Sequence, residues 1–400
     1  MILLDILFWV SVLLVLHVYV GYPVGIYLRS KLHPKAVPPK EVAGGELPYV
    51  TVLIPAHNEE RWIACKIENT LALEYPSDRL QVLVASDGST DNTMDIAARY
   101  VGRGVEVNHR AERCGKTATL NRVVPKVRGE IVLISDCNAL LPVNTLQLLV
   151  LHFQDPSVGC VTGEKVCLPT DSSASEGEGL YWRYEAWIKN SESALGSCLG
   201  SNGQVMAIRK KLFTPIPVVG DDFYIPMQIL ISAGAQVRFE PRAKASIPAA
   251  ANLGLELRRK ERSHASLLLD LPYLKGGLNP LTSRIWWRFL SHHVLRLFVP
   301  FALLIALASS TLLWRFMPLY GLIAVCQASF YGAAITGYLF ARRGWRPRIV
   351  YLPFYFVFAN LGVFLAWIRW ARGKHQYAWQ RTDRIMPTAG PATPSTEWGK

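Results

Sequence analysis

The sequence predicts an α/β fold, a mostly parallel sheet with helices on both faces, with transmembrane helices before and after it. Between residues 49 and 265, short runs of aliphatic and β-branched residues alternate with amphipathic segments. This alternation is typical of a buried parallel sheet connected by helices. Four long runs without a charged residue lie outside this region, and each is close to the ~20 residues with which a helix crosses a bilayer.

The first apolar run, Ile6–Leu28, predicts a transmembrane helix over residues 1–30. We expect it to be retained, because it lacks the basic start of a signal peptide and exceeds the usual length of its apolar part. Four basic residues follow it, at Arg29, Lys31, Lys35 and Lys40. The positive-inside rule then places the N-terminus outside and the following chain in the cytosol. A Pro- and Gly-rich linker is expected over residues 31–48.

The central region, residues 49–265, is expected to be one cytosolic domain. Its predicted strands are 49–56, 80–87, 105–109, 130–136, 158–166 and 236–244. Its predicted helices are 59–73, 92–101 and 116–127. Asp91 is expected to cap the second of these helices. Residues 178–213 show no clear periodicity, and we expect them to be less regular.

Three further apolar runs predict transmembrane segments within residues 297–370. They are 297–314, 316–341 and 349–368. Before them, residues 266–296 mix Trp, Leu and Phe with Arg and His, which predicts interfacial amphipathic helices. After them, a polar tail is expected over residues 371–400.

The predicted membrane topology contains a conflict. Three crossings after a cytosolic domain would place the tail outside, yet the tail is rich in Arg and Lys, which is an inside-type signal. Either one run does not cross or the tail breaks the rule. Pro353, Asn360 and Gly362 favour a re-entrant or interfacial last run.

Composition excludes several classes of protein. Much of the formal net charge of +13 lies beside the apolar runs, where anionic lipid explains it, and no groove-reading motif accompanies it, so we expect no nucleic-acid binding. The seven cysteines are scattered without a C-x-x-C pair, which favours reduced cytosolic thiols over disulfides or zinc. No P-loop, dinucleotide fingerprint or nucleophile elbow is present.

Polar residues stand where three predicted strands end. Pro55, His57 and Glu59 belong to the end of the first strand, Asp87 ends the second and Asp136 ends the fourth. Because ligands bind beyond the carboxyl ends of parallel strands, we expect these side chains to converge on one crevice.

Acidic residues further along the chain extend this set. The pair Asp221 and Asp222 lies in "VVGDDFYIP", and Lys116 lies in "RCGKTATLN". Carboxylates with a hard divalent cation, Mg²⁺ or Mn²⁺, suit a diphosphate ligand, and Lys116 would add positive charge beside its phosphates. Asp221 is expected to support Asp222 rather than to react itself.

Six segments in order resemble family 2 glycosyltransferases: "VTVLIPAHNEE", "DGSTDNT", "GKTATLN", "SDCNALLP", "GSNGQVMAIRK" and "GDDFYIP". The chain is most similar to the membrane-bound branch with hyaluronan, chitin, cellulose and poly-N-acetylglucosamine synthases. The resemblance implies a GT-A fold and a nucleotide-sugar donor, usually UDP-linked. It also implies a metal-dependent enzyme.

The resemblance also implies roles for single residues. The segment containing Pro55, His57 and Glu59, together with Asp87, would hold the nucleoside, and Lys116 would lie near the nucleotide. The counterpart of the family's D-x-D motif is Asp136-Cys137-Asn138, so Asp136 and Asn138 would hold the metal and the diphosphate. The family's catalytic base corresponds to Asp222.

The acceptor side departs from the processive members of this branch. Their Q-x-x-R-W motif corresponds to a stretch with Arg259 and Arg262 in place of Gln and Arg, and with Ser263 in place of Trp. Arg262 would either touch the diphosphate or, with Arg258 and Arg259, face anionic lipid. The loss of an aromatic platform puts processive polymerisation in doubt. Gly200, Asn202, Trp182, Asp221 and Arg259 are the expected acceptor-side residues.

These observations predict a multi-pass cell-membrane glycosyltransferase with its catalytic domain in the cytosol. It would transfer a sugar, with inversion, from a UDP-sugar to a saccharide or lipid-linked acceptor for a surface polysaccharide. Membrane lipid and secretion or polymerisation proteins are the expected partners. Two alternatives stay open: single transfer to a polyprenyl phosphate, and a catalytically inactive nucleotide-sugar sensor.

Overall fold

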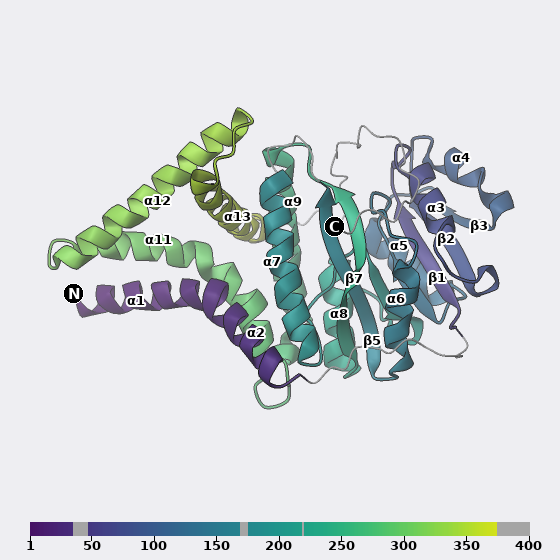
Figure 1. Ribbon diagram of the computed structural model, residues 1–400, viewed down its shortest axis with the longest axis horizontal. Coiled ribbons are helices and arrows are strands. Elements are labelled where there is room, and N and C mark those ends of the chain that lie inside the picture. The colour runs from purple at the N-terminus through teal and green to yellow at the C-terminus, as the bar shows by residue number, and fades with distance from the viewer. Residues whose placement is uncertain (35–46, 169–174, 218–219, 374–400) are drawn as a thin grey trace. The chain divides into compact units, whose positions relative to one another are not determined.

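The computed structural model describes residues 1–34, 47–168, 175–217 and 220–373 (Figure 1). They form two compact units, which we call the sheet unit and the helix unit. The sheet unit comprises the described residues within 29–170 and 181–249. The helix unit comprises those within 1–28, 171–180 and 250–375. Most of the predicted linker and of the polar tail lies outside the described residues.

The sheet unit is built on one mixed, mostly parallel sheet (Figure 1). In the described chain the strand order is β3-β2-β1-β4-β6-β5-β7. The strands are β1 Val50–Ala56, β2 Leu80–Asp87, β3 Val105–Arg110, β4 Ile131–Ile134, β5 Val158–Leu168, β6 Met206–Arg209 and β7 Gln236–Pro248. Only β6 runs antiparallel to its neighbours among these strands. The predicted fold class is therefore confirmed.

Helices cover both faces of this sheet. They are α3 Ile63–Leu71, α4 Thr93–Ala98, α5 Lys116–Val123, α6 Thr145–Leu151, α7 Ser175–Ala194 and α8 Asp221–Ser232. Every residue of β1 is buried, as expected for a strand with both faces covered. On one face, Val52 and Ile54 share a core with Ile67 of α3 and Leu146 of α6. Short 3-10 turns lie at Ser77–Arg79, Val101–Arg103, Val124–Lys126, His152–Gln154 and Lys210–Leu212.

The expectation of a less regular stretch at 178–213 was wrong. This part of the chain contains most of the long helix α7 and the strand β6. Along α7, the buried positions include Glu185, Lys189 and Glu192. Because ionisable residues occupy places that an amphipathic helix usually fills with apolar ones, the 3.6-residue periodicity is hidden in the sequence.

The helix unit contains the apolar helices. The first is continuous through α1 Ile2–Leu16, a π turn at His17–Gly21 and α2 Tyr22–Leu32. The others are α9 Leu253–Asp270, a 3-10 turn Lys275–Leu278, α10 Trp286–Phe289, a π turn Leu290–Val294, α11 Leu295–Leu313, α12 Pro318–Arg342 and α13 Arg348–Ala371.

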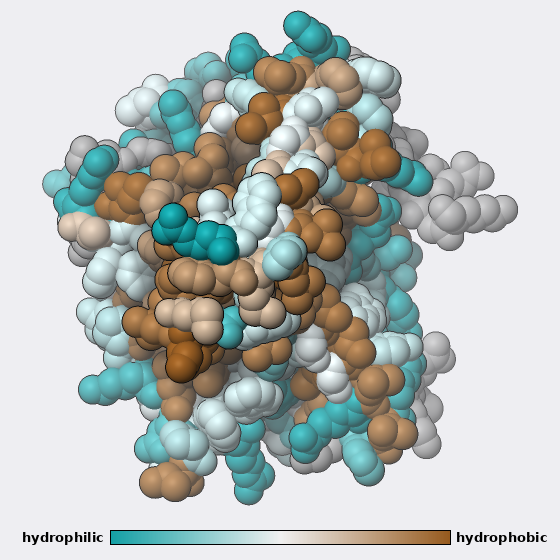
Figure 2. All heavy atoms as spheres, turned by 90° about the vertical axis from the view of Figure 1, so that its left-hand side faces the viewer, coloured by the Kyte–Doolittle hydropathy of each residue, from teal (hydrophilic) through white to brown (hydrophobic). Residues whose placement is uncertain are grey.

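Four helices of the described chain are long and apolar enough to cross a membrane. They are Ile2–Leu32, Trp286–Leu313, Pro318–Arg342 and Arg348–Ala371, and they contain the four predicted apolar runs to within two residues at the ends. Large apolar side chains on their surfaces are exposed, for example Leu13, Leu304 and Leu322. Figure 2 shows such side chains gathered, in brown, on the side of these helices. An exposed apolar surface of this kind is typical of helices that face lipid.

Candidate active site

A lysine ammonium joins two acidic side chains at one edge of the sheet. Lys116, the first residue of α5, lies with its Nζ 2.7 Å from Oδ1 of Asp136 and 2.9 Å from Oδ2 of Asp221. Asp136 follows β4, and Asp221 begins α8. The three side chains keep only 12%, 19% and 10% of their surface exposed, so they interact with little screening by water.

The pKa values of Lys116 and Asp221 are strongly perturbed. Burial lowers the pKa of Lys116, but the carboxylates of Asp136 and Asp221 outweigh it and raise this pKa above its usual range. Burial raises the pKa of Asp221 to about 6, with Asp222 and Asp136 adding to the rise and Lys116 opposing it. At neutral pH the lysine is therefore charged, and Asp221 gains a proton on mild acidification.

Asp222 is exposed beside this cluster, on the first turn of α8. Its main-chain carbonyl accepts hydrogen bonds from N–H and Oγ of Ser201, at 2.9 and 2.6 Å. Gly203 lies next to it: a Cβ there would be 3.4 Å from Cβ of Asp222 and 3.6 Å from Nζ of Lys116. An exposed carboxylate at a helix N-terminus, next to a buried charge cluster, is a suitable general base.

Asp87 is linked to the cluster through the main chain. It is 1% exposed, and its carboxylate oxygens accept hydrogen bonds from N–H of Cys114 at 2.8 Å and of Gly115 at 2.7 Å. Gly115 immediately precedes Lys116 and has a φ of 96°, which favours glycine. The carboxylate thus fixes the start of α5 and with it the origin of the Lys116 side chain. Its predicted contact with a nucleoside stays a prediction.

Hydrogen bonds connect the residues that follow β1 to those at and after the end of β2. Nδ1 of His57 lies 2.7 Å from the main-chain carbonyl of Asp87. The N–H of Glu59 donates to Oγ1 of Thr93 at 2.7 Å, and Glu59 is buried. Pro55 is buried in β1, where its carbonyl accepts the thiol of Cys137 at 3.4 Å. These three residues therefore lie at the predicted edge of the sheet, and their donor contacts stay predictions.

Asp91 accepts hydrogen bonds from two main-chain N–H groups and so has a structural role. One of its oxygens accepts a hydrogen bond from the N–H of Thr93, the first residue of α4, at 3.0 Å. The other accepts from the N–H of Glu60 at 3.2 Å. Its carboxylate therefore satisfies a first-turn donor of the helix and joins the ends of two strands.

Two residues near Asp136, Gln204 and Lys66, were not predicted from the sequence to belong to the site. Gln204 donates from Nε2 to Oδ2 of Asp136 at 3.1 Å. Lys66 of α3 has no exposed surface, and its Nζ donates to Oγ of Ser135 and to the carbonyl of Ala139, each at 2.7 Å. Burial lowers the pKa of Lys66 to about 8. The sequence feature that could have predicted the burial of Lys66 is its position between Ile63 and Ile67, on the buried face of α3.

Three of the predicted acceptor-side residues of the sheet unit, Asn202, Gly200 and Trp182, contact other parts of the protein. Asn202 is buried; its amide donates to the carbonyl of Gly163 at 2.6 Å and accepts from Nζ of Lys189 at 2.9 Å. Gly200 has a φ of 80° and lies against Phe223. Trp182 stacks under the ammonium of Lys165, which is 3.9 Å from the ring centre. The acceptor contacts of all three stay predictions.

Two predicted residues, Arg259 and Arg262, belong to α9 in the helix unit. The guanidinium of Arg259 is paired there, 2.7 Å from Glu178 and 2.7 Å from Glu256. Arg262 is half-buried on the same helix. Their predicted contacts with donor and acceptor stay predictions.

The side chains around Asp136 could hold a divalent cation only if a bound diphosphate supplied some of its ligands. Within the described chain, no three His, Cys, Asp or Glu side chains converge to hold a metal by themselves. Asp136 and the half-buried Asn138 offer hard oxygen donors on one turn after β4. Mg²⁺ commonly takes one or two protein carboxylates and fills its shell with substrate phosphate and water, which such a pair allows.

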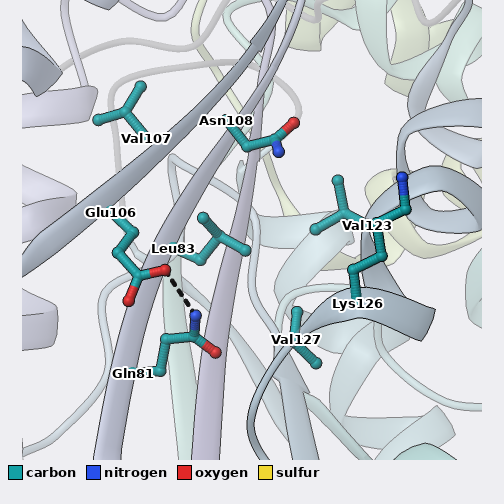
Figure 3. Close-up of a pocket in the computed structure, with 8 residues that line it drawn as sticks. All are labelled: Gln81, Leu83, Glu106, Val107, Asn108, Val123, Lys126 and Val127. Atoms are coloured by element: carbon teal, nitrogen blue, oxygen red, sulfur yellow. Dashed lines mark hydrogen bonds between the residues drawn. The ribbon is translucent and has the colours of Figure 1, made fainter.

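A pocket of about 160 Å³ opens elsewhere on the sheet unit (Figure 3). Gln81 and Leu83 line it from the first half of β2, whereas Asp87 ends that strand. A hydrogen bond of 2.7 Å joins Gln81 to Glu106 of the neighbouring strand β3 on one side of the pocket (Figure 3). Ligand sites of parallel sheets lie beyond the carboxyl ends of the strands, so this pocket is not the candidate active site.

The fold of the sheet unit and the acidic cluster at one edge of its sheet are those expected of a GT-A transferase. Comparisons with models of protein families agree with this class. The model described as "Glycosyl transferase family group 2" matches residues 131–368, and "Glycosyl transferase family 2" matches residues 51–193. The chain therefore belongs to glycosyltransferase family 2, and the predicted resemblance is confirmed.

Two relatives are named as synthases of a glucosyldiacylglycerol and of a polysaccharide. A beta-monoglucosyldiacylglycerol synthase of Nostoc sp. is 33% identical over 172 residues, covering 41% of this chain and 36% of the relative. A poly-beta-1,6-N-acetyl-D-glucosamine synthase of Staphylococcus epidermidis is 22% identical over 207 residues, covering 48% of each chain. The matched segments thus span between about a third and a half of these relatives.

One solved structure is similar over nearly the whole chain. It is a mannosyltransferase of Pyrobaculum calidifontis in complex with GDP-Man and Mn²⁺. The likeness has a TM-score of 0.68 and 22% identity, and it covers 92% of this chain and 99% of the other. At this identity the likeness establishes the fold alone.

Proposed function

We propose that this protein is a metal-dependent, inverting glycosyltransferase that transfers a sugar from a UDP-sugar to a lipid-linked or saccharide acceptor. The observation that carries the proposal is the Lys116 ammonium between Asp136 and Asp221, with the exposed Asp222 beside it. A buried cation held by carboxylates suits an anionic diphosphate, and an exposed carboxylate next to it suits proton removal.

In the proposed reaction each residue has one task. Asp222 takes the proton from the acceptor hydroxyl as that hydroxyl attacks the anomeric carbon. Lys116, freed from one carboxylate, offsets the negative charge that grows on the departing nucleoside diphosphate. Asp136 and Asn138 would hold a divalent cation, which supplies further positive charge there. Direct displacement on the face opposite the leaving group inverts the anomeric configuration.

A lipid acceptor is favoured over a growing polymer. The Nostoc relative is a diacylglycerol glucolipid synthase, and the chain has four helices that suit a membrane. Arg259, at the place of the Gln in the processive motif, is engaged with two glutamates, and Ser263 replaces the Trp. Without an aromatic platform that retains the product, we expect one transfer per acceptor.

The test is an incubation of membranes containing the protein with labelled UDP- and GDP-sugars, with and without EDTA. We expect release of nucleoside diphosphate, a label that enters organic solvent, and loss of both with EDTA. A label in water-soluble polymer would contradict the lipid acceptor. No diphosphate release from any donor, at expression levels verified by blotting, would contradict the enzyme and favour the nucleotide-sugar sensor.

We further propose a cell-membrane location with the sheet unit in the cytosol and only three crossings, α1, α11 and α12. The helix that we exclude from the crossings is α13, which packs along the charged helix α9. Arg369 pairs with Glu261 at 3.2 Å, Gly362 lies against Cβ of Lys260, and Tyr355 meets Glu256 at 3.4 Å. Charged residues are costly inside the hydrocarbon core, so a helix lined by α9 over this length lies outside it.

Two further contacts of α13, one near each of its ends, agree with this topology. Its start meets Gly337 near the end of α12, and Trp367 near its end donates to the carbonyl of Leu297, early in α11. The opposite ends of the spans form a separate cluster of Phe8, Ala306, Leu313 and Tyr320, without a residue of α13. α13 is one continuous helix, which favours the interfacial alternative over a re-entrant one.

Three crossings remove the conflict in the charge pattern. The chain after α1, the basic end of α12 and the basic tail all then lie on the cytosolic side. Reporters fused to the C-terminus test this: we expect a fluorescent GFP fusion and an inactive alkaline phosphatase fusion. An active phosphatase would show that α13 crosses.

A further inference from the structure

Two lysines of the sheet unit are buried without a carboxylate partner among the described residues. Lys66 of α3 is fully buried, and Lys189 of α7 is 6% exposed. Their ammonium groups are satisfied by carbonyl, hydroxyl and amide oxygens instead. A buried cation without a carboxylate in direct contact is costly, so two of them in one unit call for an explanation beyond packing.

Lys66 stabilises the loop that carries Asp136, residues 135–139. Its two hydrogen bonds, to Ser135 and to the carbonyl of Ala139, enclose this loop from both ends. The hydroxyl of Ser135 donates in turn to the carbonyl of Gln204 at 2.7 Å, and Gln204 donates to Asp136. The lysine therefore determines where the Asp136 carboxylate and the Asn138 amide lie.

Lys189 stabilises a second loop, residues 200–204, which contacts the start of α8. Its Nζ donates to the carbonyl of Ser201 at 3.0 Å and to Oδ1 of Asn202 at 2.9 Å. Ser201 donates from both N–H and Oγ to the carbonyl of Asp222. The lysine therefore acts on the main chain of the proposed base, through a single residue.

We propose that Lys66 and Lys189 are positioning residues with separate tasks, Lys66 for the donor diphosphate and Lys189 for the base. The proposal rests on the proposed function, because it assigns one loop to the donor and the other to proton transfer. Each ammonium also places a fixed positive charge beneath a loop at which negative charge is bound or develops. Neither lysine touches substrate; each acts through a loop.

Kinetics separate the two tasks. With the nucleotide sugar that gives turnover, Lys66→Met should raise the donor KM about tenfold, the effect of losing a charged hydrogen bond, with a smaller change in kcat. Lys189→Met should lower kcat about tenfold and leave the donor KM near that of the wild type. The same pattern of change in both variants would overturn the proposal, because lost stability alone affects the two parameters without this division.

Binding supplies a readout that does not depend on turnover. Calorimetry of the detergent-solubilised chain with UDP and with GDP, each with Mn²⁺, should show weaker binding by Lys66→Met and unchanged binding by Lys189→Met. Equal binding by both variants and the wild type would overturn the role of Lys66. If the wild type binds neither nucleotide and transfers no sugar, the proposed function itself fails, which is a different result.

Milder variants cover the case in which a methionine variant does not fold. Ser135→Ala removes one acceptor of Lys66, and Ser201→Ala removes a donor to Asp222. We expect them to reproduce the KM effect and the kcat effect, respectively. The matched control is Asn69→Ala on α3: Asn69 exchanges two hydrogen bonds with Leu141, just beyond the Asp136 loop. It should lower stability without changing the donor KM, and a raised KM there would contradict the assignment.

Discussion

In the described chain, both the sheet unit and the helix unit contain a cationic side chain that lies between two acidic ones. The two clusters differ in the geometry of their contacts and in the exposure of their carboxylates. In the sheet unit, Lys116 lies between Asp136 and Asp221. In the helix unit, Arg259 lies between Glu178 and Glu256, whose side chains have no exposed surface. Arg259 binds Glu256 through two nitrogens, Nε and an Nη, each at 2.9 Å. The chemical components are similar, but their geometry and exposure are not.

The difference indicates which cluster is a site. A guanidinium with a forked contact is fixed in one geometry, whereas an ammonium is a point charge on a flexible stem and exchanges partners easily. Asp136 and Asp221 keep 19% and 10% of their side-chain surface exposed and lie beside the exposed Asp222, so a ligand has access to them. We therefore interpret the Arg259 cluster as structural and the Lys116 cluster as the place of chemistry.

The largest effect is expected at Asp222. Asp222→Asn removes the proposed base from an exposed position, so turnover should fall about 10³-fold while folding is unchanged. Nucleoside diphosphate release and a thermal melt in detergent measure the two properties. Turnover within a few-fold of the wild type would exclude Asp222 as the base.

The next effect concerns the helix unit alone. Arg259→Met leaves Glu178 and Glu256 buried without this cation, and should lower the free energy of unfolding by about 3–5 kcal/mol. Thermal unfolding in detergent measures it. The control variant, Arg259→Met with Glu178→Gln and Glu256→Gln, should recover most of the loss. If the single variant is as stable as the wild type, the cluster is not structural.

Exchanging the kind of cation sharpens the comparison. Lys116→Arg keeps the charge but gives it a planar fork, so turnover should fall about tenfold with stability changed by less than about 1 kcal/mol. Arg259→Lys should show the reverse, a loss of about 1–2 kcal/mol of stability, since hydrogen bonds to charged groups are lost. Similar behaviour of the two exchanges would remove the distinction between the clusters.

The smallest effect is a dependence on pH. The pKa of Asp221 in the folded protein, about 6, lies above the ordinary value of about 3.9, so its ionisation opposes folding. This destabilisation is absent below pH about 4 and grows as the pH rises through 6. Asp221→Asn should therefore melt above the wild type at pH 7, with a difference that narrows toward pH 4.5. A difference independent of pH would show that Asp221 does not titrate in this range.

Prediction from sequence succeeded where structure depends on near neighbours in the chain. Strand β2, for example, has the predicted bounds of 80–87, and the four long helices contain the apolar runs to within two residues. Prediction from the sequence failed at α7, where the ionisable side chains of Glu185, Lys189 and Glu192 occupy buried positions that apolar residues usually fill. It also missed Lys66, because a lysine in an amphipathic helix is normally assigned to the solvent face.

For the site, the sequence identified the acidic residues and Lys116 but not their partners. Asp87 was expected to face a ligand, which stays a prediction; its oxygens accept hydrogen bonds from the two main-chain amides that precede Lys116, which the sequence did not indicate. Asn202 was expected on the acceptor side, and its amide is engaged with Lys189 and Gly163. Such partners lie tens of residues apart, and no local pattern of residues encodes them.

By itself the sequence determined the alternation of strands and helices, the apolar spans and the ordered motifs of the family. These features follow from side-chain periodicity, span length and residue order, all of which are local. Only the tertiary structure decided which ions are compensated, which carboxylate stays exposed and which helix lies against the charged face of α9. The physical reason is that the free energy of a buried charge depends on the groups around it in space, and packing alone determines those groups.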